Sequence, residues 1–165
     1  MPILDDHCLD FISRSPEQTR RIGMRLGGLL EPGDLVCLQG ELGSGKTTFA
    51  QGVAQGWGAL DTVSSPTFVL VNLYRRPDGG QLFHMDAYRI ESAPEGEELD
   101  LESMLSQGPV LVEWPERLGN ILPAARLAVN LEHVAEEHRQ MRMLASGARY
   151  DAIVADLRQA IFGVG

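Results

Sequence analysis

A short glycine-containing segment constrains this chain more than any other feature of its sequence. Residues 40–47 read Gly-Glu-Leu-Gly-Ser-Gly-Lys-Thr, which is the pattern G-x4-G-K-T. The apolar run Leu35–Leu38 precedes it, and residues 47–54 have the composition of a helix, although Gly52 weakens that helix. A buried strand, a glycine-rich loop and a helix in this order are typical of a phosphate-binding P-loop, and we predict one here.

The residue types in this segment suit the binding of a nucleotide. Glycines allow backbone N–H groups to point into one concavity, and the helix N-terminus adds its positive dipole. We expect Lys46 to reach the β- and γ-phosphates and Thr47 to offer its hydroxyl to Mg²⁺. Lys46 is the single lysine among 14 basic residues, and an arginine does not replace a compact ammonium in a tight pocket. A guanine pocket with an N/T-K-x-D motif would need another lysine, so ATP is the predicted nucleotide.

Two acidic residues stand where a nucleotide hydrolase needs carboxylates. The apolar run Val110–Val112 ends in Glu113, as a Walker B strand ends in the acid that holds Mg²⁺ or orients water. Asp86 follows a predicted strand, and alternation along that strand would place His84, Asp86 and Tyr88 on one face. Solvated strand ends also carry such acids, and we assign no catalytic role to His84.

The rest of the chain predicts one α/β domain over residues 1–165, without an internal repeat or linker. A capping box at Ser15–Gln18, with proline at the first helical position, begins a helix. Segments 68–74 and 81–85 flank a turn at 76–80 and indicate a β-hairpin. Further helices are predicted at 95–106 and 150–162, and further strands at 109–112, 126–133 and 139–144.

Composition excludes several classes of protein. The 165 residues are 44% hydrophobic and 22% charged, which is near globular averages and argues against disorder. No apolar run approaches the roughly 18 residues that cross a bilayer, and the acidic start does not resemble a signal peptide, so we expect a cytoplasmic protein without a membrane partner. The net charge of −9 disfavours strong nucleic-acid binding by the chain alone. Cys8 and Cys37 form no C-x-x-C motif and are interpreted as inert thiols.

Four segments in a fixed order make the chain resemble the TsaE family, the bacterial ATPases that assist threonylcarbamoyl modification of adenosine in tRNA. The matching segments are residues 40–49, 65–68, 84–89 and 111–116. The resemblance implies a P-loop NTPase-like α/β fold, with a mostly parallel central sheet flanked by helices and extended by antiparallel strands. It also implies weak ATP hydrolysis by the protein alone and action with the TsaB–TsaD pair, in which TsaD carries out the transfer to tRNA.

The resemblance also implies roles for individual residues. Asp86 and Glu113 would serve the metal and the attacking water as catalytic residues, and which of them ligates Mg²⁺ stays open. Thr67 would lie in a switch-like loop, and Trp114 would shape the nucleotide or partner surface, unless it is a core aromatic. The residues expected to contact the nucleotide are Gly43, Ser44, Gly45, Lys46, Thr47, Thr48, Thr67 and Trp114, and those expected at the metal are Thr47, Asp86 and Glu113.

Alternatives stay open at the level of sequence. A small P-loop kinase acting on a metabolite would usually carry an arginine-rich lid, and no arginine cluster follows the Walker B strand. A regulatory subunit without turnover would need a defective acid, whereas two acids are present. No arginine stands out as a finger in cis, and Arg75, Arg76 and Arg89 are the candidates. Residues 91–102 carry six acids and no base, which indicates either a solvated helix face or a docking surface for a basic partner.

Overall fold

The computed structural model describes residues 5–41, 44–60, 71–90 and 99–163, and within them seven strands form one sheet. The strands are β1 (Cys8–Ser13), β2 (Leu35–Gln39), β3 (Val71–Arg75), β4 (Gln81–Asp86), β5 (Val110–Glu113), β6 (Arg126–Ala135) and β7 (His138–Ser146). The helices are α1 (Pro16–Gly27), α2 (Lys46–Trp57), α4 (Leu101–Gln107) and α5 (Ala148–Phe162), with short 3₁₀ segments η1 (Pro115–Arg117) and η2 (Gly119–Ile121).

The sheet is parallel at its centre and antiparallel at both sides. Its order is β1-β7-β6-β2-β5-β4-β3, and the neighbours β6, β2, β5 and β4 all run parallel. The pairs β1–β7, β6–β7 and β3–β4 are antiparallel. The expected α/β class is therefore confirmed, and the described pairings agree with the expected parallel centre, formed by β6, β2, β5 and β4 and extended by antiparallel strands. The four central strands end at one edge of the sheet, which is where open α/β sheets bind ligands.

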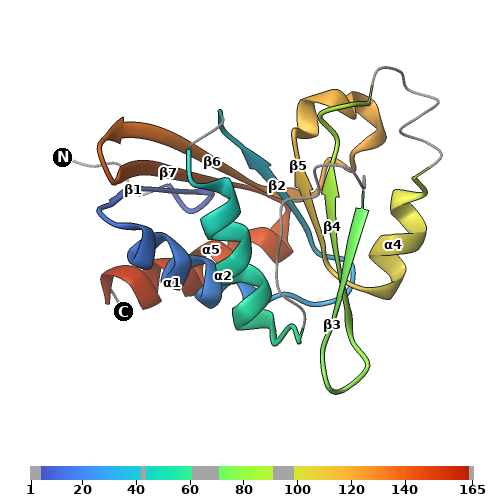
Figure 1. Ribbon diagram of the computed structural model, residues 1–165. Coiled ribbons are helices and arrows are strands. Elements are labelled where there is room, and N and C mark those ends of the chain that lie inside the picture. The colour runs from blue at the N-terminus through green and yellow to red at the C-terminus, as the bar shows by residue number, and fades with distance from the viewer. Residues whose placement is uncertain (1–4, 42–43, 61–70, 91–98, 164–165) are drawn as a thin grey trace.

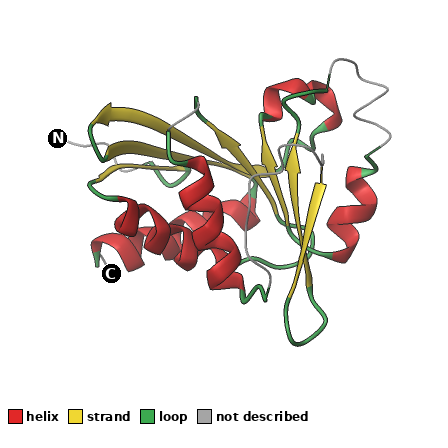
Figure 2. Ribbon diagram, viewed as in Figure 1, coloured by secondary structure: helices red, strands yellow, loops and turns green. Residues whose placement is uncertain are grey.

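Two hydrophobic cores lie on opposite faces of this sheet. Helices α1, α2 and α5 cover one face, and α4 covers the other over β4 and β5 (Figures 1 and 2). The first core includes the fully buried Phe49, Leu26 and Ile153, and the second includes Met85 and Val112. Because β2 contributes side chains to both cores, the segment that follows β2 starts from a strand held on both faces.

Local sequence signals account for several element boundaries. Helix α1 begins as predicted, since the Ser15 hydroxyl accepts a hydrogen bond of 3.1 Å from the backbone N–H of Gln18. Helix α4 begins at Leu101, where the Asp100 carboxylate caps it by accepting from the Ser103 N–H at 3.3 Å. Residues 95–98 of the predicted helix lie outside the described residues. Strand β1 was not predicted: its pairing partner β7 lies more than 120 residues away in sequence.

The described helices include none that is long and apolar enough to cross a membrane. Burial raises the pKa of the Cys37 thiol to about 11, and Cys8 is half-buried, so neither thiol is activated and both are free.

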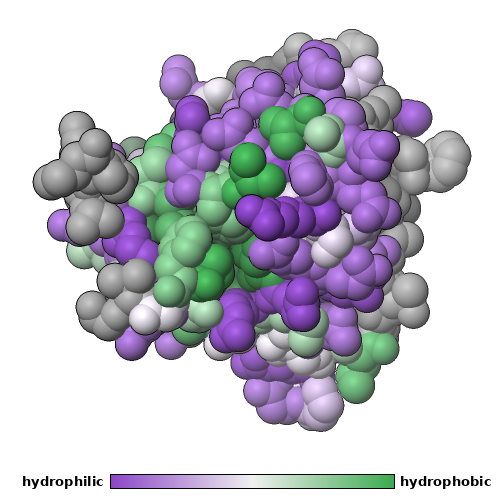
Figure 3. Space-filling view, turned by 90° about the vertical axis from the view of Figure 1, so that its left-hand side faces the viewer, coloured by the Kyte–Doolittle hydropathy of each residue, from purple (hydrophilic) through white to green (hydrophobic). Residues whose placement is uncertain are grey.

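The side of the molecule shown in Figure 3 carries an area where hydrophobic residues gather between hydrophilic ones. The exposed apolar side chains of the elements on this side include Ile12 of β1 and Phe162 of α5.

Glycines allow helices α1 and α2 to approach each other closely. A Cβ added to Gly52 would lie 2.1 Å from the carbonyl oxygen of Arg20, and one added to Gly56 would lie 1.9 Å from that of Met24. Two glycines of α1 face the backbone of α2 in the same way, at 2.5 and 2.0 Å. Gly52 weakens α2 as an isolated helix, and its place in this crossing gives the physical reason for its presence.

We expect Gly56→Ala to destabilise the protein by at least about 2 kcal/mol, because a backbone carbonyl cannot move aside as a flexible side chain can. Urea denaturation would measure the change in the free energy of unfolding. Gly28→Ala is the matched control: Gly28 has a φ of −66°, and its added Cβ would meet its nearest atom at 3.7 Å. Equal stability of the two variants would contradict the close approach of α1 and α2.

Candidate functional site

The segment 40–45 joins β2 to α2 at the edge where the central strands end. Gly45 caps α2 in the left-handed region with a φ of 101°. Gly40 has a φ of 152°, and a Cβ there would lie 2.5 Å from the Leu131 carbonyl oxygen and 2.5 Å from the Ser44 Oγ. The predicted order of strand, glycine loop and helix is therefore confirmed, with the glycine at position 40 required for the loop to pass β6. Residues 42 and 43 lie outside the described residues, so the expectation for Gly43 stays a prediction.

Lys46 occupies the first turn of α2 and is buried, with 6% of its surface exposed. Its Nζ lies 4.1 Å from the centroid of the Trp114 ring and has no hydrogen-bond partner within the described part of the chain. Burial lowers the pKa of Lys46, and the carboxylates of Glu113 and Asp86 act against that shift. A buried ammonium without an acceptor is unfavourable, and an anion bound at this point would supply the missing acceptors.

The two predicted acids lie side by side at the ends of neighbouring parallel strands. Asp86 ends β4 and Glu113 ends β5, and the two are register partners. Burial raises the pKa of Asp86, and the Tyr88 N–H opposes the shift by donating to its Oδ1 at 2.9 Å. Both acids act electrostatically on Lys46, so the structure brings together three residues that are 27 or more positions apart in sequence.

A buried histidine that sequence analysis left without a role holds Glu113. The Nε2 of His84 lies 2.7 Å from the Glu113 Oε2, and its Nδ1 lies 3.0 Å from the Tyr74 hydroxyl. His84 is 1% exposed and Glu113 is 4% exposed, so the contact is shielded from water. A neutral imidazole serves both partners when Nε2–H donates to Glu113 and Nδ1 accepts from Tyr74. Alternation of His84 with Asp86 was visible in the sequence, but the partner on β5 was not.

Trp114 belongs both to the site and to the second core. It follows β5 directly, adopts a left-handed φ of 59° and packs against that core while its ring covers Lys46. The Tyr88 ring lies 4.9 Å from the Trp114 ring, and the Arg117 guanidinium lies 5.5 Å from the Tyr88 ring. The two interpretations of Trp114, as a site residue and as a core aromatic, therefore do not exclude each other.

Comparison with known proteins decides the family. A family model described as "Threonylcarbamoyl adenosine biosynthesis protein TsaE" matches residues 13–141. The chain belongs to the TsaE family. The TsaE protein of Bacillus subtilis, named for tRNA threonylcarbamoyladenosine biosynthesis, is 38% identical over 145 residues, covering 87% of this chain and 89% of the relative. The TsaE protein of Streptomyces coelicolor is 40% identical over 137 residues, covering 79% and 93%.

A solved structure has the same fold as this chain. The crystal structure of Bacillus subtilis YdiB matches with a TM-score of 0.76 and 31% identity, covering 93% of this chain and 95% of the other. The resemblance drawn from the four sequence segments is thus confirmed.

The remaining predicted residues of this TsaE family member lie at different distances from the site. Ser44 is buried and its Oγ has no partner among the residues described, Thr48 is half-buried, and Thr47 is exposed at the start of α2. Thr67 lies outside the described residues.

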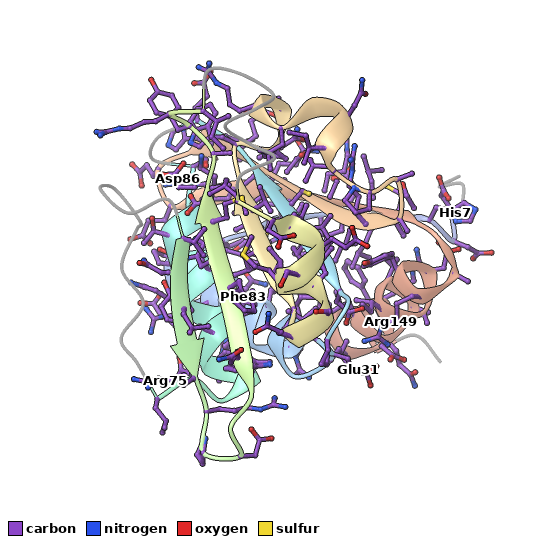
Figure 4. All side chains as sticks on the ribbon, turned by 90° about the vertical axis from the view of Figure 1, so that its right-hand side faces the viewer. His7, Glu31, Arg75, Phe83, Asp86 and Arg149 are labelled. Carbon is purple, nitrogen blue, oxygen red and sulfur yellow. The ribbon has the colours of Figure 1, made fainter. Side chains whose placement is uncertain are left out.

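Arg75 is the last residue of β3 and lies at the end of the β3–β4 hairpin opposite to Asp86, as Figure 4 shows. Arg76 packs on the Trp57 ring at 4.5 Å, so neither arginine is placed to act as a finger.

Arg139 is a second basic residue at the loop, and sequence analysis did not single it out. Arg139 is the second residue of β7. Its side chain would lie within 3.8 Å of a Cβ added to Gly45. Its Nη1 donates to the carbonyl oxygens of Glu136 and His138, which fixes the turn between β6 and β7. Its Nε is buried and has no partner within the described residues. The sequence holds no signal for this position, because the approach of β7 to the loop is tertiary.

Proposed function

We propose that this chain is a Mg²⁺-dependent ATPase of P-loop NTPase-like fold that supports tRNA threonylcarbamoyladenosine biosynthesis in the cytoplasm, together with TsaB and TsaD. The observation that carries the proposal is the buried Lys46 ammonium, which has no acceptor within the described residues and lies close to Asp86 and Glu113. The family to which the chain belongs supports the tRNA part of the proposal.

Lys46 and the start of α2 would bind the phosphates of ATP. The ammonium would donate to phosphate oxygens, and the first N–H groups of α2 point out of the helix toward the same place. Each charge-assisted hydrogen bond contributes about 1.5–3 kcal/mol, so about three to six of them would supply the roughly 8 kcal/mol of micromolar binding. Trp114 would keep water away from one side of Lys46 and so strengthen its interaction with the phosphates.

The residues at the strand ends fit a magnesium ion. Asp86 and Glu113 would hold it with the Thr47 hydroxyl, and Mg²⁺ commonly takes one or two carboxylates and completes its octahedron with phosphate oxygens and water. The described residues contain no group of three or more His, Cys, Asp and Glu side chains placed to hold a metal. When bound, the ion would neutralise charge on the transferring phosphoryl group. Glu113, which His84 contacts at 2.7 Å, would orient the attacking water or help to hold the ion.

Slow turnover in the absence of partners follows from the same arrangement. An arginine that stabilises charge in the transition state is worth about 10³–10⁵ in rate in enzymes of this class. Arg75 and Arg76 lie away from Asp86 and Glu113, so the described residues offer neither as that group. Arg89, the third candidate, is exposed three residues after Asp86. A partner protein would therefore supply the missing charge or position Arg89, and TsaD or TsaB is the partner we propose.

Phosphate release tests the proposal directly. Purified protein would be assayed with MgATP alone and with purified TsaB–TsaD, and we expect slow release that the partners increase by at least about tenfold. Transfer of the phosphoryl group to an added metabolite would instead support a small kinase. Tight binding of ATP with no release under either condition would indicate a regulatory subunit, and both results would contradict the proposed ATPase.

A further inference from the structure

Three buried polar side chains form a diagonal row across β3, β4 and β5, the three neighbouring strands on one side of the sheet. Tyr74, His84 and Glu113 are 3%, 1% and 4% exposed. Tyr74 pairs in register with Leu82, two residues before His84. His84 pairs in register with Leu111, two residues before Glu113. Because side chains two apart share a face of a sheet and diagonal neighbours are within reach of long side chains, the row crosses two strand pairings on one face.

Tyr74 fixes the tautomer of His84 at the end of the row away from Glu113. The Tyr74 hydroxyl lies 3.0 Å from the His84 Nδ1, and the His84 Nε2 lies 2.7 Å from the Glu113 Oε2. A carboxylate only accepts, so Nε2 must carry a proton to bond with it. In the neutral imidazole Nδ1 is then an acceptor, to which the Tyr74 hydroxyl donates. Without that hydroxyl the proton can move to Nδ1, and the Nε2 lone pair would then face the carboxylate.

The orientation of Glu113 matters for the chemistry of the site, and this step rests on the proposed function. Glu113 is the carboxylate that most strongly offsets the lowering of the Lys46 pKa by burial, so its charge acts at the place proposed for the phosphates. A glutamate side chain has several rotatable bonds, and the contact at Oε2 restricts them. Groups that orient a metal ligand or an active-site base through such contacts are worth about 10–100-fold in activity.

We propose that Tyr74 is a positioning residue for ATP hydrolysis, which acts through His84 to hold Glu113 in one orientation. The imidazole binds Oε2, and Oε1 is then directed to the attacking water or to Mg²⁺. Tyr74 and His84 do not contact the nucleotide in this arrangement. Their substitution should therefore lower kcat for phosphate release and leave KM for ATP unchanged. Loss of packing alone would instead lower the stability of the folded protein.

A double-mutant cycle on phosphate release by the full chain with TsaB–TsaD tests the row. Tyr74→Phe removes only the hydroxyl and is expected to lower kcat about tenfold at unchanged KM. In the Glu113→Gln background the same substitution is expected to cause no further loss, because the carboxylate that Tyr74 orients is absent. Additive losses would mean that Tyr74 does not act through Glu113, and they would overturn the inference.

Tyr150→Phe is the matched control for Tyr74→Phe. Tyr150 is 4% exposed, and its hydroxyl accepts a hydrogen bond of 2.9 Å from the Leu35 N–H. Leu35 begins β2, at the opposite end of that strand from the glycine loop. The control therefore removes an equally buried and hydrogen-bonded hydroxyl far from Glu113. Thermal unfolding should show that it is destabilised, while its kcat and KM stay at the wild-type values.

Two amides at position 84 separate the contacts of the histidine. The amide nitrogen of glutamine is as many bonds from Cα as the His84 Nε2, and that of asparagine is as many bonds away as Nδ1. His84→Gln can therefore still donate to Glu113, whereas His84→Asn reaches only the side of Tyr74. We expect the Gln variant to have a kcat roughly tenfold above that of the Asn variant, at equal KM. This comparison tests the row even if Tyr74→Phe fails to fold.

The remaining outcomes separate the row from the ATPase itself. A wild-type kcat in a folded Tyr74→Phe, or equal kcat values of the two His84 variants, would overturn the positioning role and leave the proposed ATPase intact. A wild-type protein that releases no phosphate from MgATP with TsaB–TsaD would contradict the proposed function, and with it this inference, before any variant is compared.

Discussion

Replacing Lys46 by alanine is expected to lower the affinity for ATP by at least about two orders of magnitude, which is the loss of two charge-assisted hydrogen bonds to phosphate. The Lys46 Nζ lies beside the Trp114 ring and has no hydrogen-bond partner within the described residues, so its donors are unused there. Isothermal titration calorimetry with MgATP would measure the affinity. An affinity within a few-fold of the wild type would contradict the phosphate role of Lys46.

The same substitution is expected to leave the stability of the ligand-free protein unchanged or to raise it. A buried ammonium without an acceptor destabilises the folded state, and alanine removes it. Thermal unfolding without nucleotide would show this, and it separates loss of binding from loss of folding. Lys46→Arg is the second variant: a planar guanidinium does not replace the compact ammonium that lies 4.1 Å from the Trp114 ring centroid, and we expect this variant to lose ATP binding as well.

The pKa of Lys46 gives a pH dependence with a defined sign. Burial lowers this pKa in the folded protein below the value of 10.5 that an unperturbed lysine has. Between the folded and unfolded values the unfolded chain binds more protons, so the free energy of unfolding contributed by Lys46 rises with pH there. ATP prefers the charged form, and its binding should weaken as pH rises through the folded value. Lys46→Ala should remove both effects, which calorimetry across this pH range would show.

Sequence reasoning succeeded where the signal is local. Ser15 and Gln18 predicted the start of α1 because a cap and its recipient are three residues apart. The glycine loop and the strand before Glu113 were predicted for the same reason, because each is a continuous segment with its own pattern. In each case the residues that carry the pattern lie within a few positions of the structure that they specify. Such local structure can therefore be predicted from the sequence alone.

Tertiary contacts account for what the sequence did not reveal. His84 was visible as a residue, but its contact with Glu113 depends on the pairing of β4 with β5 across 29 positions. Arg139 gains its position at the loop only when β6 and β7 join the sheet beside β2. Strand β1 forms because β7 offers an edge, and its own six residues carry a weak alternation. Long-range pairing of this kind leaves little trace in a single sequence.

Replacing Glu113 by glutamine is expected to reduce the rate of phosphate release by about 10²–10³, which is typical of removing one electrostatic or proton-transfer group from an active site. Glutamine keeps the shape of the side chain, and its amide oxygen can still accept from the His84 Nε2 that lies 2.7 Å from Glu113 in the wild type. The folded structure and the binding of ATP should therefore be retained. Steady-state assays with TsaB–TsaD, combined with calorimetry for ATP, would separate the effect on rate from the effect on binding.

Glu116→Gln is the matched control for Glu113→Gln. Glu116 is an exposed acid three residues further along the chain, and its Oε2 accepts from the Gln39 side chain at 3.3 Å. It contributes less than Glu113 and Asp86 to the field at Lys46, so losing its charge should leave the rate within about twofold. If Glu113→Gln and Glu116→Gln had equal rates, Glu113 would have a structural role as the partner of His84, and the water and the metal would depend on Asp86 alone.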